Sequence, residues 1–279
     1  MVTVSTMARS SSSRDISFDT DFGSARIRWD GPRATLFLGD VESSALDTSD
    51  PTYLEFEYMQ HMDAVVSSLW GPQDRFRALH VGGAACALAC AWSSSHPQSR
   101  HVAVEVDRLL AEQVREHFPI PKAPQVKIRV GDGRAVLDGT REGSFDVIVR
   151  DAFASGVTPD HLRTVECADR ARRVLTASGV YLVNCAHGGP ANARQDVAAL
   201  QDVFPFVASI QDPKVGRGGR RGNVVALASA ADVVDVDQID RALRMLALPA
   251  RITRPAELTR WVAGTPTLTD AQVGYPQAD

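Results

Sequence analysis

The chain has 279 residues, of which 44% are hydrophobic and 23% are charged, and its formal net charge is -4. This composition is ordinary for a soluble globular protein and allows one large core, or one core with a small appendage. The weak negative charge argues against a nucleic-acid partner, whose phosphates would require an excess of basic residues. It is compatible with a small cationic or zwitterionic substrate.

The N-terminal stretch and the cysteines predict the compartment. Residues 1–15 lack the apolar core of a signal peptide, and no apolar run in the chain reaches membrane-spanning length. No two of the four cysteines form a CxxC pair, which favours reduced thiols. We therefore expect a cytoplasmic protein with no membrane partner and a disordered leader over residues 1–15, in which Met7 is a second candidate start.

The first predicted unit, residues 16–50, is a small β domain. Apolar and polar residues alternate, and turn residues at Asp21 to Gly23 and at Asp30 to Pro32 separate the strand-like pieces. A polar loop over residues 42–50 is expected to lead into a helix that begins at Asp50-Pro51 and continues to Leu69.

The second predicted unit, residues 51–230, alternates strands with helices, which indicates an α/β fold with a doubly wound, Rossmann-like, mostly parallel sheet. A closing hairpin predicts one antiparallel edge strand. After residue 230 we expect a helix over 236–246 and a proline-punctuated tail. The strands before the last one are expected at 78–81, 101–105, 125–130, 145–149, 180–184 and 206–210.

Glycines and acids follow four successive predicted strands, where open α/β sheets bind ligands. Glycine lets the chain turn sharply beside a ligand, and a carboxylate at the end of the next strand can accept both ribose hydroxyls. Each acid taken alone would also fit a helix cap, but the whole series predicts a nucleotide site. The residues are Gly82 and Gly83, Glu105, Asp132 with Gly133, and Asp151.

The order GG, E, GDG and DVIVxD resembles the class I S-adenosylmethionine-dependent methyltransferase fold. Within that fold it is similar to the spermidine synthase, or polyamine aminopropyltransferase, family over about residues 18–228. The resemblance implies that Glu105 binds ribose, that Asp132 binds the adenine amino group, and that Asp151 handles the attacking amine. LEFEYMQHM resembles the family's EFxYxE stretch, which places Tyr58 and Gln60 in the polyamine groove.

Three acids of the family pattern are neutral here. GGAACA replaces GGGDGG and puts Ala85 in place of an acid; DAFA replaces DxxD and puts Ala154 in place of another; Gln60 replaces the glutamate of the helix motif. A polycation needs several carboxylates, because one ion pair near water contributes only about 1 kcal/mol or less. The nucleoside half of the site therefore matches the family, whereas the amine half is eroded.

The resemblance implies a homodimer that transfers an aminopropyl group from decarboxylated S-adenosylmethionine to an amine or polyamine without a metal. The missing acids leave open that this activity is weak or lost. Two alternatives remain. One is a methyltransferase that uses S-adenosylmethionine itself; methyl transfer differs from aminopropyl transfer only in which carbon on the sulfur faces the nucleophile. The other is a non-catalytic nucleoside- or polyamine-binding protein.

Overall fold

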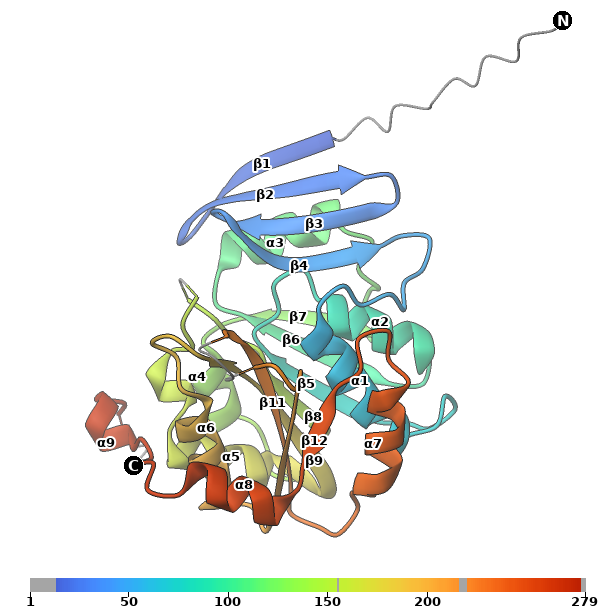
Figure 1. The fold of residues 1–279 in the computed structure, drawn as a ribbon. Coiled ribbons are helices and arrows are strands. Elements are labelled where there is room, and N and C mark those ends of the chain that lie inside the picture. The colour runs from blue at the N-terminus through green and yellow to red at the C-terminus, as the bar shows by residue number, and fades with distance from the viewer. Residues whose placement is uncertain (1–13, 155, 216–219, 277–279) are drawn as a thin grey trace, which may run out of the picture.

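The computed structural model describes residues 14–154, 156–215 and 220–276, so most of the predicted leader lies outside the described part. The described chain forms two sheets, a small N-terminal sheet above the end of a larger one (Figure 1). The small sheet is antiparallel throughout, in the order β1-β2-β3-β4. Its strands are β1 (Arg14–Thr20), β2 (Gly23–Asp30), β3 (Arg33–Leu38) and β4 (Val41–Asp47).

Strand β4 corrects the expectation of a polar loop over residues 42–50. The segment starts with Glu42 and two serines, which suggested a loop, but its second half buries Ala45 and Leu46. That half pairs with β3, so tertiary burial outweighs the polar start.

The larger sheet has the order β12-β10-β11-β9-β8-β5-β6-β7. Strands β5 to β9 pair in parallel, whereas β11 is antiparallel to both β9 and β10, and β12 is antiparallel to β10. The mostly parallel α/β sheet is confirmed, but β11 lies inside the sheet and not at its edge. The strands are β5 (Arg77–Val81), β6 (Arg100–Glu105), β7 (Val126–Val130), β8 (Phe145–Arg150), β9 (Leu175–His187), β10 (Phe206–Gln211), β11 (Gly222–Ser229) and β12 (Arg251–Thr253).

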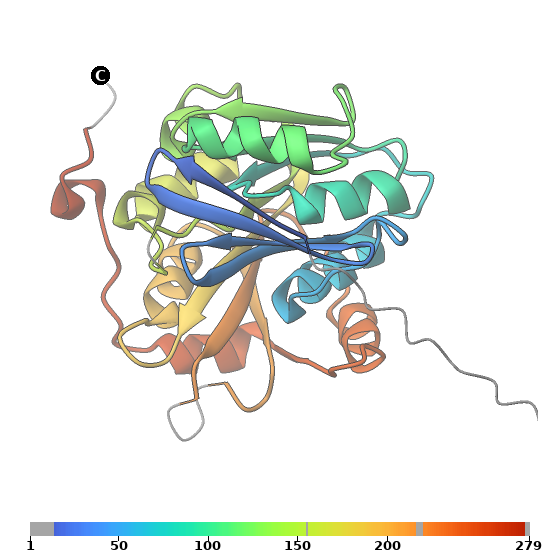
Figure 2. The same cartoon turned by 90° about the horizontal axis from the view of Figure 1, so that it is seen from above.

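Helices cover both faces of the larger sheet (Figures 1 and 2). Successive β5 residues point to opposite faces, so Ala78 joins the core beneath α1, α2, α3 and α7, while Leu79 joins the core beneath α4, α5, α6 and α8. Both faces of the sheet are therefore buried under helices, which is typical of a parallel sheet. The helices are α1 (Glu57–Leu69), α2 (Ala87–Ser95), α3 (Arg108–His117), α4 (Gly133–Asp138), α5 (Val165–Val174), α6 (Ala193–Gln201), α7 (Val236–Arg244), α8 (Pro255–Val262) and α9 (Asp270–Val273), with a 3-10 turn, η1 (Asp160–Leu162).

Helix α1 begins later than the sequence predicted. Asp50 does not cap it; its carboxylate accepts hydrogen bonds from the backbone N–H (3.1 Å) and the hydroxyl (2.6 Å) of Thr52, which closes a local turn. Such turns compete with helix capping for the same residue types. Phe56 occupies the N-cap position, without a side-chain cap.

The two sheets are joined through the start of α3. Asp21, in the turn between β1 and β2, accepts hydrogen bonds from the backbone N–H groups of Arg108 (2.6 Å) and Leu109 (3.2 Å). A carboxylate at a helix N-terminus satisfies donors that the helix itself leaves unpaired. This contact fixes the N-terminal sheet over the carboxyl ends of the parallel strands.

The chain after residue 230 contributes more than the expected helix and tail. It also supplies β12, α8 and α9, and α9 is anchored by Asp270, which accepts hydrogen bonds from Arg134 at 2.8 and 2.6 Å. Within the described ranges, no helix is both long and apolar enough to cross a bilayer.

Candidate active site

A cavity of about 500 Å³ opens where the carboxyl ends of the parallel strands face α1 and β4. Seven of the residues predicted from the sequence line it: Tyr58, Gly82, Gly83, Glu105, Asp132, Gly133 and Asp151. The strand-end residues and Tyr58, which the family resemblance placed in the site, thus line one cavity although Tyr58 and its hydrogen-bond partner Asp151 are 93 residues apart in the chain. Polar lining residues that the sequence did not single out are Glu42, Ser43, Ser44, Asn184 and Asn223.

Two of the glycines are required by close packing. Gly82 has φ +92°, and a Cβ atom added there would lie 2.2 Å from the carbonyl oxygen of Asp151. A Cβ atom on Gly133 would lie 2.4 Å from Cγ1 of Val81. Any side chain at either position would therefore displace the segment beside it, the backbone at Asp151 or the end of β5 at Val81.

Two residues that follow Gly83 in this loop have positive φ angles, which glycine adopts most easily, although neither is a glycine. Ala84 has φ 38° and Cys86 has φ 58°, and both align with glycines of the GGGDGG pattern. The left-handed region costs an ordinary residue about 1–2 kcal/mol. Burial also raises the pKa of the Cys86 thiol, so this cysteine is a packing residue and not a reactive one.

Glu105 is held by the backbone of two loops. Its Oε2 accepts from the N–H of Ala84 at 2.9 Å, and its Oε1 accepts from the N–H of Asp107 at 3.1 Å. Burial raises the pKa of Glu105, while these hydrogen bonds lower it. Each oxygen keeps a second lone pair, so an oriented carboxylate remains able to accept two hydroxyl groups.

Asp132 is both a helix cap and part of the cavity wall. Its Oδ1 accepts from the N–H of Ala135 at 2.9 Å, so the capping role considered for this acid is real. Its Oδ2 lies 2.9 Å from Nε2 of His161, and this contact lowers the pKa of Asp132. The imidazole in turn stacks on Tyr275, with ring centroids 5.6 Å apart and planes 5° from parallel. The C-terminal segment therefore supports Asp132 through His161, a role that no local pattern indicated.

Asp151 is held by side chains. Its Oδ2 accepts from the Tyr58 hydroxyl at 2.8 Å and its Oδ1 accepts from Nδ2 of Asn184 at 2.8 Å. Asn184 in turn accepts from Nδ2 of Asn223 at 2.8 Å. Burial raises the pKa of Asp151, although both hydrogen bonds oppose the shift. The pKa of Tyr58 is also raised, chiefly by burial, so its phenol stays protonated as a donor.

Gln60 lies elsewhere than the sequence predicted. It is not among the cavity-lining residues of the described chain, and its Nε2 donates to the carbonyl of Leu54 at 2.7 Å. Residues two apart in a helix project from different sides, so Tyr58 and Gln60 do not face the same cavity.

The other two neutral replacements differ in their surroundings. Ala85 is completely buried in the core, whereas Ala154 is exposed and lines the cavity. An acid at position 154 would therefore face the cavity, whereas an acid at position 85 would have to be buried in the surroundings that Ala85 now has.

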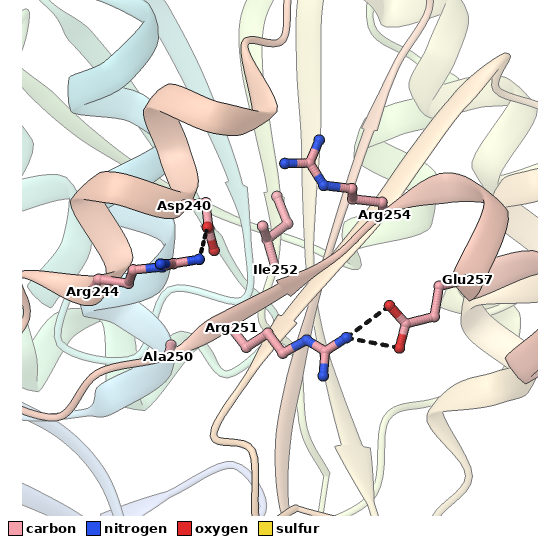
Figure 3. A pocket seen from close by; sticks show the side chains of 7 residues that line it. All are labelled: Asp240, Arg244, Ala250, Arg251, Ile252, Arg254 and Glu257. Carbon is pink, nitrogen blue, oxygen red and sulfur yellow. Dashed lines mark hydrogen bonds and ion pairs between the residues drawn. The ribbon is translucent and has the colours of Figure 1, made fainter.

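A second hollow, of about 350 Å³, lies among α7, β12 and α8 (Figure 3). Its arginines are already paired: Arg244 with Asp240 at 2.6 Å, Arg251 with Glu257 at 2.8 Å, and Arg254 with Asp237, which is not drawn. Because these charges compensate one another, the hollow offers no polar group comparable to the carboxylates at the strand ends.

The sheet order, the helices on both faces and the acids at the strand ends define a Rossmann-like protein of the class I methyltransferase fold. Human methyltransferase-like protein 13, solved in complex with SAH, shares this fold at 17% identity, with a TM-score of 0.55 over 77% of this chain and 96% of that chain.

The family is shown by a closer relative, a probable spermidine synthase from Corynebacterium glutamicum. It is 31% identical, with a TM-score of 0.83 over 91% of this chain and 95% of that chain. The chain therefore belongs to the spermidine synthase family. A polyamine aminopropyltransferase of Vibrio vulnificus is 26% identical over 110 residues, which cover 39% of this chain but only 37% of that protein. No family model matches the chain.

Proposed function

We propose that this protein transfers an aminopropyl group from decarboxylated S-adenosylmethionine to an amine. Support comes from one cavity in which Glu105 is free to accept the ribose hydroxyls and Asp132 to accept the adenine amino group, while Asp151 faces the same space. Glycines 82, 83 and 133 allow the backbone to approach the nucleoside closely. Family membership and the matched aminopropyltransferase favour the same reaction.

The reaction needs little chemical machinery beyond these residues. Asp151 takes a proton from the acceptor ammonium, and the neutral nitrogen attacks the methylene carbon next to the sulfonium. The C–N bond forms while the C–S bond breaks, the electron pair stays on sulfur, and methylthioadenosine leaves. Tyr58 and Asn184 fix both oxygens of Asp151, so that positioning and general-base catalysis contribute together.

The choice of cofactor is supported by the charge of the cavity. Among the described residues that line it, none is lysine, arginine or histidine. S-Adenosylmethionine carries a carboxylate that would need a partner, whereas the decarboxylated form lacks this group. This observation favours aminopropyl transfer over methyl transfer.

Calorimetric titration tests the proposal directly. We expect methylthioadenosine and decarboxylated S-adenosylmethionine to bind, and S-adenosylmethionine to bind about five- to 150-fold more weakly, since one unpaired carboxylate costs about 1–3 kcal/mol. Tighter binding of S-adenosylmethionine would favour the methyltransferase alternative. Binding of nucleosides without methylthioadenosine release from any amine would favour the non-catalytic alternative.

We also propose that the protein is a cytoplasmic homodimer. The family resemblance implies that the small β domain pairs subunits, and a sheet of this size is marginal alone. The four cysteines are buried and unpaired, which suits a reducing compartment. Light scattering at micromolar concentration is expected to give the dimer mass, and a monomer mass would contradict the assembly.

A further inference from the structure

The amine half of the cavity contains fewer charges than a diamine requires. Two of the four carboxylates that line the cavity, Glu105 and Asp132, belong to the nucleoside half. Of the remaining two, Asp151 is at the end of β8, and Glu42 is an exposed residue on β4. Deep in the amine half, Asp151 is thus the one carboxylate among the described lining residues.

The hydrogen bonds around Asp151 fix which way the side-chain amides of Asn184 and Asn223 are oriented. An ionised carboxylate only accepts, so Asn184 must turn its Nδ2 toward Asp151 and its Oδ1 toward Asn223. Asn223 must then donate through its own Nδ2. The oxygen of Asn223 remains as an acceptor without a partner among the described residues, and it carries no net charge.

The surface next to Asp151 is apolar. Phe153 is 36% exposed although it is a large hydrophobic residue, and both it and Ala154 line the cavity. An alkyl chain that leaves Asp151 would cover these side chains and gain from burial. A second ammonium at the far end would lose part of its water and lie beside the neutral groups of Phe153, Ala154 and Asn223, so no charge-assisted contact would offset that loss.

We propose that the acceptor is a monoamine, with its single ammonium at Asp151 and an uncharged tail along Phe153, Ala154 and Asn223. The tail is an alkyl chain or ends in a hydroxyl, which the free oxygen of Asn223 can accept. This inference depends on the proposed aminopropyl transfer and specifies its substrate class.

The test compares three amines of equal length that differ only at the far end: pentylamine (methyl), aminobutanol (hydroxyl) and putrescine (ammonium). Each is titrated by calorimetry into protein saturated with methylthioadenosine, and each is assayed for methylthioadenosine release from decarboxylated S-adenosylmethionine. We expect both monoamines to bind at least about tenfold tighter than putrescine and to turn over faster, because only putrescine carries a second ammonium that loses water without gaining a charged partner. Equal or tighter binding of putrescine would overturn the inference but leave the proposed function intact. Failure of methylthioadenosine to bind at all would instead remove the proposed function.

Two variants sharpen this result. Ala154→Asp adds a carboxylate to the apolar wall of the amine half, so putrescine binding should improve about two- to fivefold and pentylamine binding should not, whereas Ala154→Ser, the uncharged control, should leave putrescine weak. Glu42→Gln should leave the order of the three amines unchanged. A selective loss of putrescine binding in Glu42→Gln would show that the rim holds a second ammonium, and the acceptor would then be a diamine.

Discussion

The two halves of the cavity hold their carboxylates by different means. Glu105 accepts its hydrogen bonds from backbone N–H groups, which any residue except proline can supply, and Asp132 is held by one backbone N–H together with the His161 side chain. Asp151 is held by the side chains of Tyr58 and Asn184, which come from α1 and β9. A backbone-held site survives sequence change as long as the chain keeps its course, whereas a site built from side chains changes with each substitution. Ala154, the departure from the family pattern that lines the cavity, is a side-chain change in the amine half, and Glu105, which the backbone holds, matches the family.

The strongest test of this comparison is Asp151→Asn, which keeps the shape of the side chain and removes the base. We expect aminopropyl transfer to fall by about 10²–10⁴-fold, the usual contribution of a positioned base. Affinity for methylthioadenosine should stay within about twofold, because the nucleoside half is separate. A parallel loss of nucleoside binding would show that the halves are not independent.

The pH profile of the unmodified enzyme sharpens the same test. Burial raises the pKa of Asp151, and the carboxylate must be ionised to take a proton. Transfer should therefore fall as the pH drops through this raised pKa, at a higher pH than for an ordinary aspartate. Asp151→Asn should lack this acidic limb in its residual activity.

Glu105→Ala tests the other half and should have the next largest effect. Two charge-assisted hydrogen bonds to ribose, each about 1.5–3 kcal/mol, would be lost, so affinity for methylthioadenosine should fall by at least about 10²-fold. Because Glu105 also holds the loop at Ala84, circular dichroism and thermal unfolding must show a folded variant. Unchanged affinity in a folded protein would contradict the assigned ribose site.

Tyr275→Ala tests whether the C-terminal segment supports the nucleoside half. The ring stacks on His161, which holds Asp132, and such stacking contributes about 0.5–1.5 kcal/mol. We expect affinity for methylthioadenosine to fall by roughly two- to tenfold. Tyr275→Phe keeps the ring and is the matched control, so it should bind normally; equal losses in both variants would assign the effect to the hydroxyl bond with Asp138.

Local sequence patterns were sufficient for the residues that follow parallel strands. Gly82, Glu105, Asp132 and Asp151 stand at strand ends that the apolar runs marked clearly, and the sheet brings such ends together whatever the loops do. Gln60 was placed in the groove by the family resemblance and not by strand ends, and the helix turns its side chain away from the cavity to the carbonyl of Leu54.

Residues that depend on distant pairing could not be predicted. Asn184 meets Asn223 only because β11 inserts between β9 and β10 in one register, with Asn223 opposite Ala186. The ring of His161 stacks on Tyr275, and the segment that carries Tyr275 is anchored by the ion pair of Arg134 and Asp270. Hydrophobic periodicity carries no information on strand order inside a sheet or on where a tail docks.

The smallest expected effect concerns the loop after Gly83, where Ala84 has a positive φ angle although it is not a glycine. Ala84→Gly should relieve about 1–2 kcal/mol of left-handed strain and add about 0.5–1 kcal/mol of unfolded-state entropy, a net stabilisation of about 1 kcal/mol or less. Ala85→Gly is the matched control: its backbone φ is not positive and its methyl group is buried, so the same change should destabilise. Urea unfolding measures both, and methylthioadenosine affinity should be unchanged in Ala84→Gly, since the N–H that holds Glu105 remains. If both variants lost stability equally, the left-handed conformation of Ala84 would not cost folding free energy. Strain in this loop would then not be the consequence of replacing its glycines.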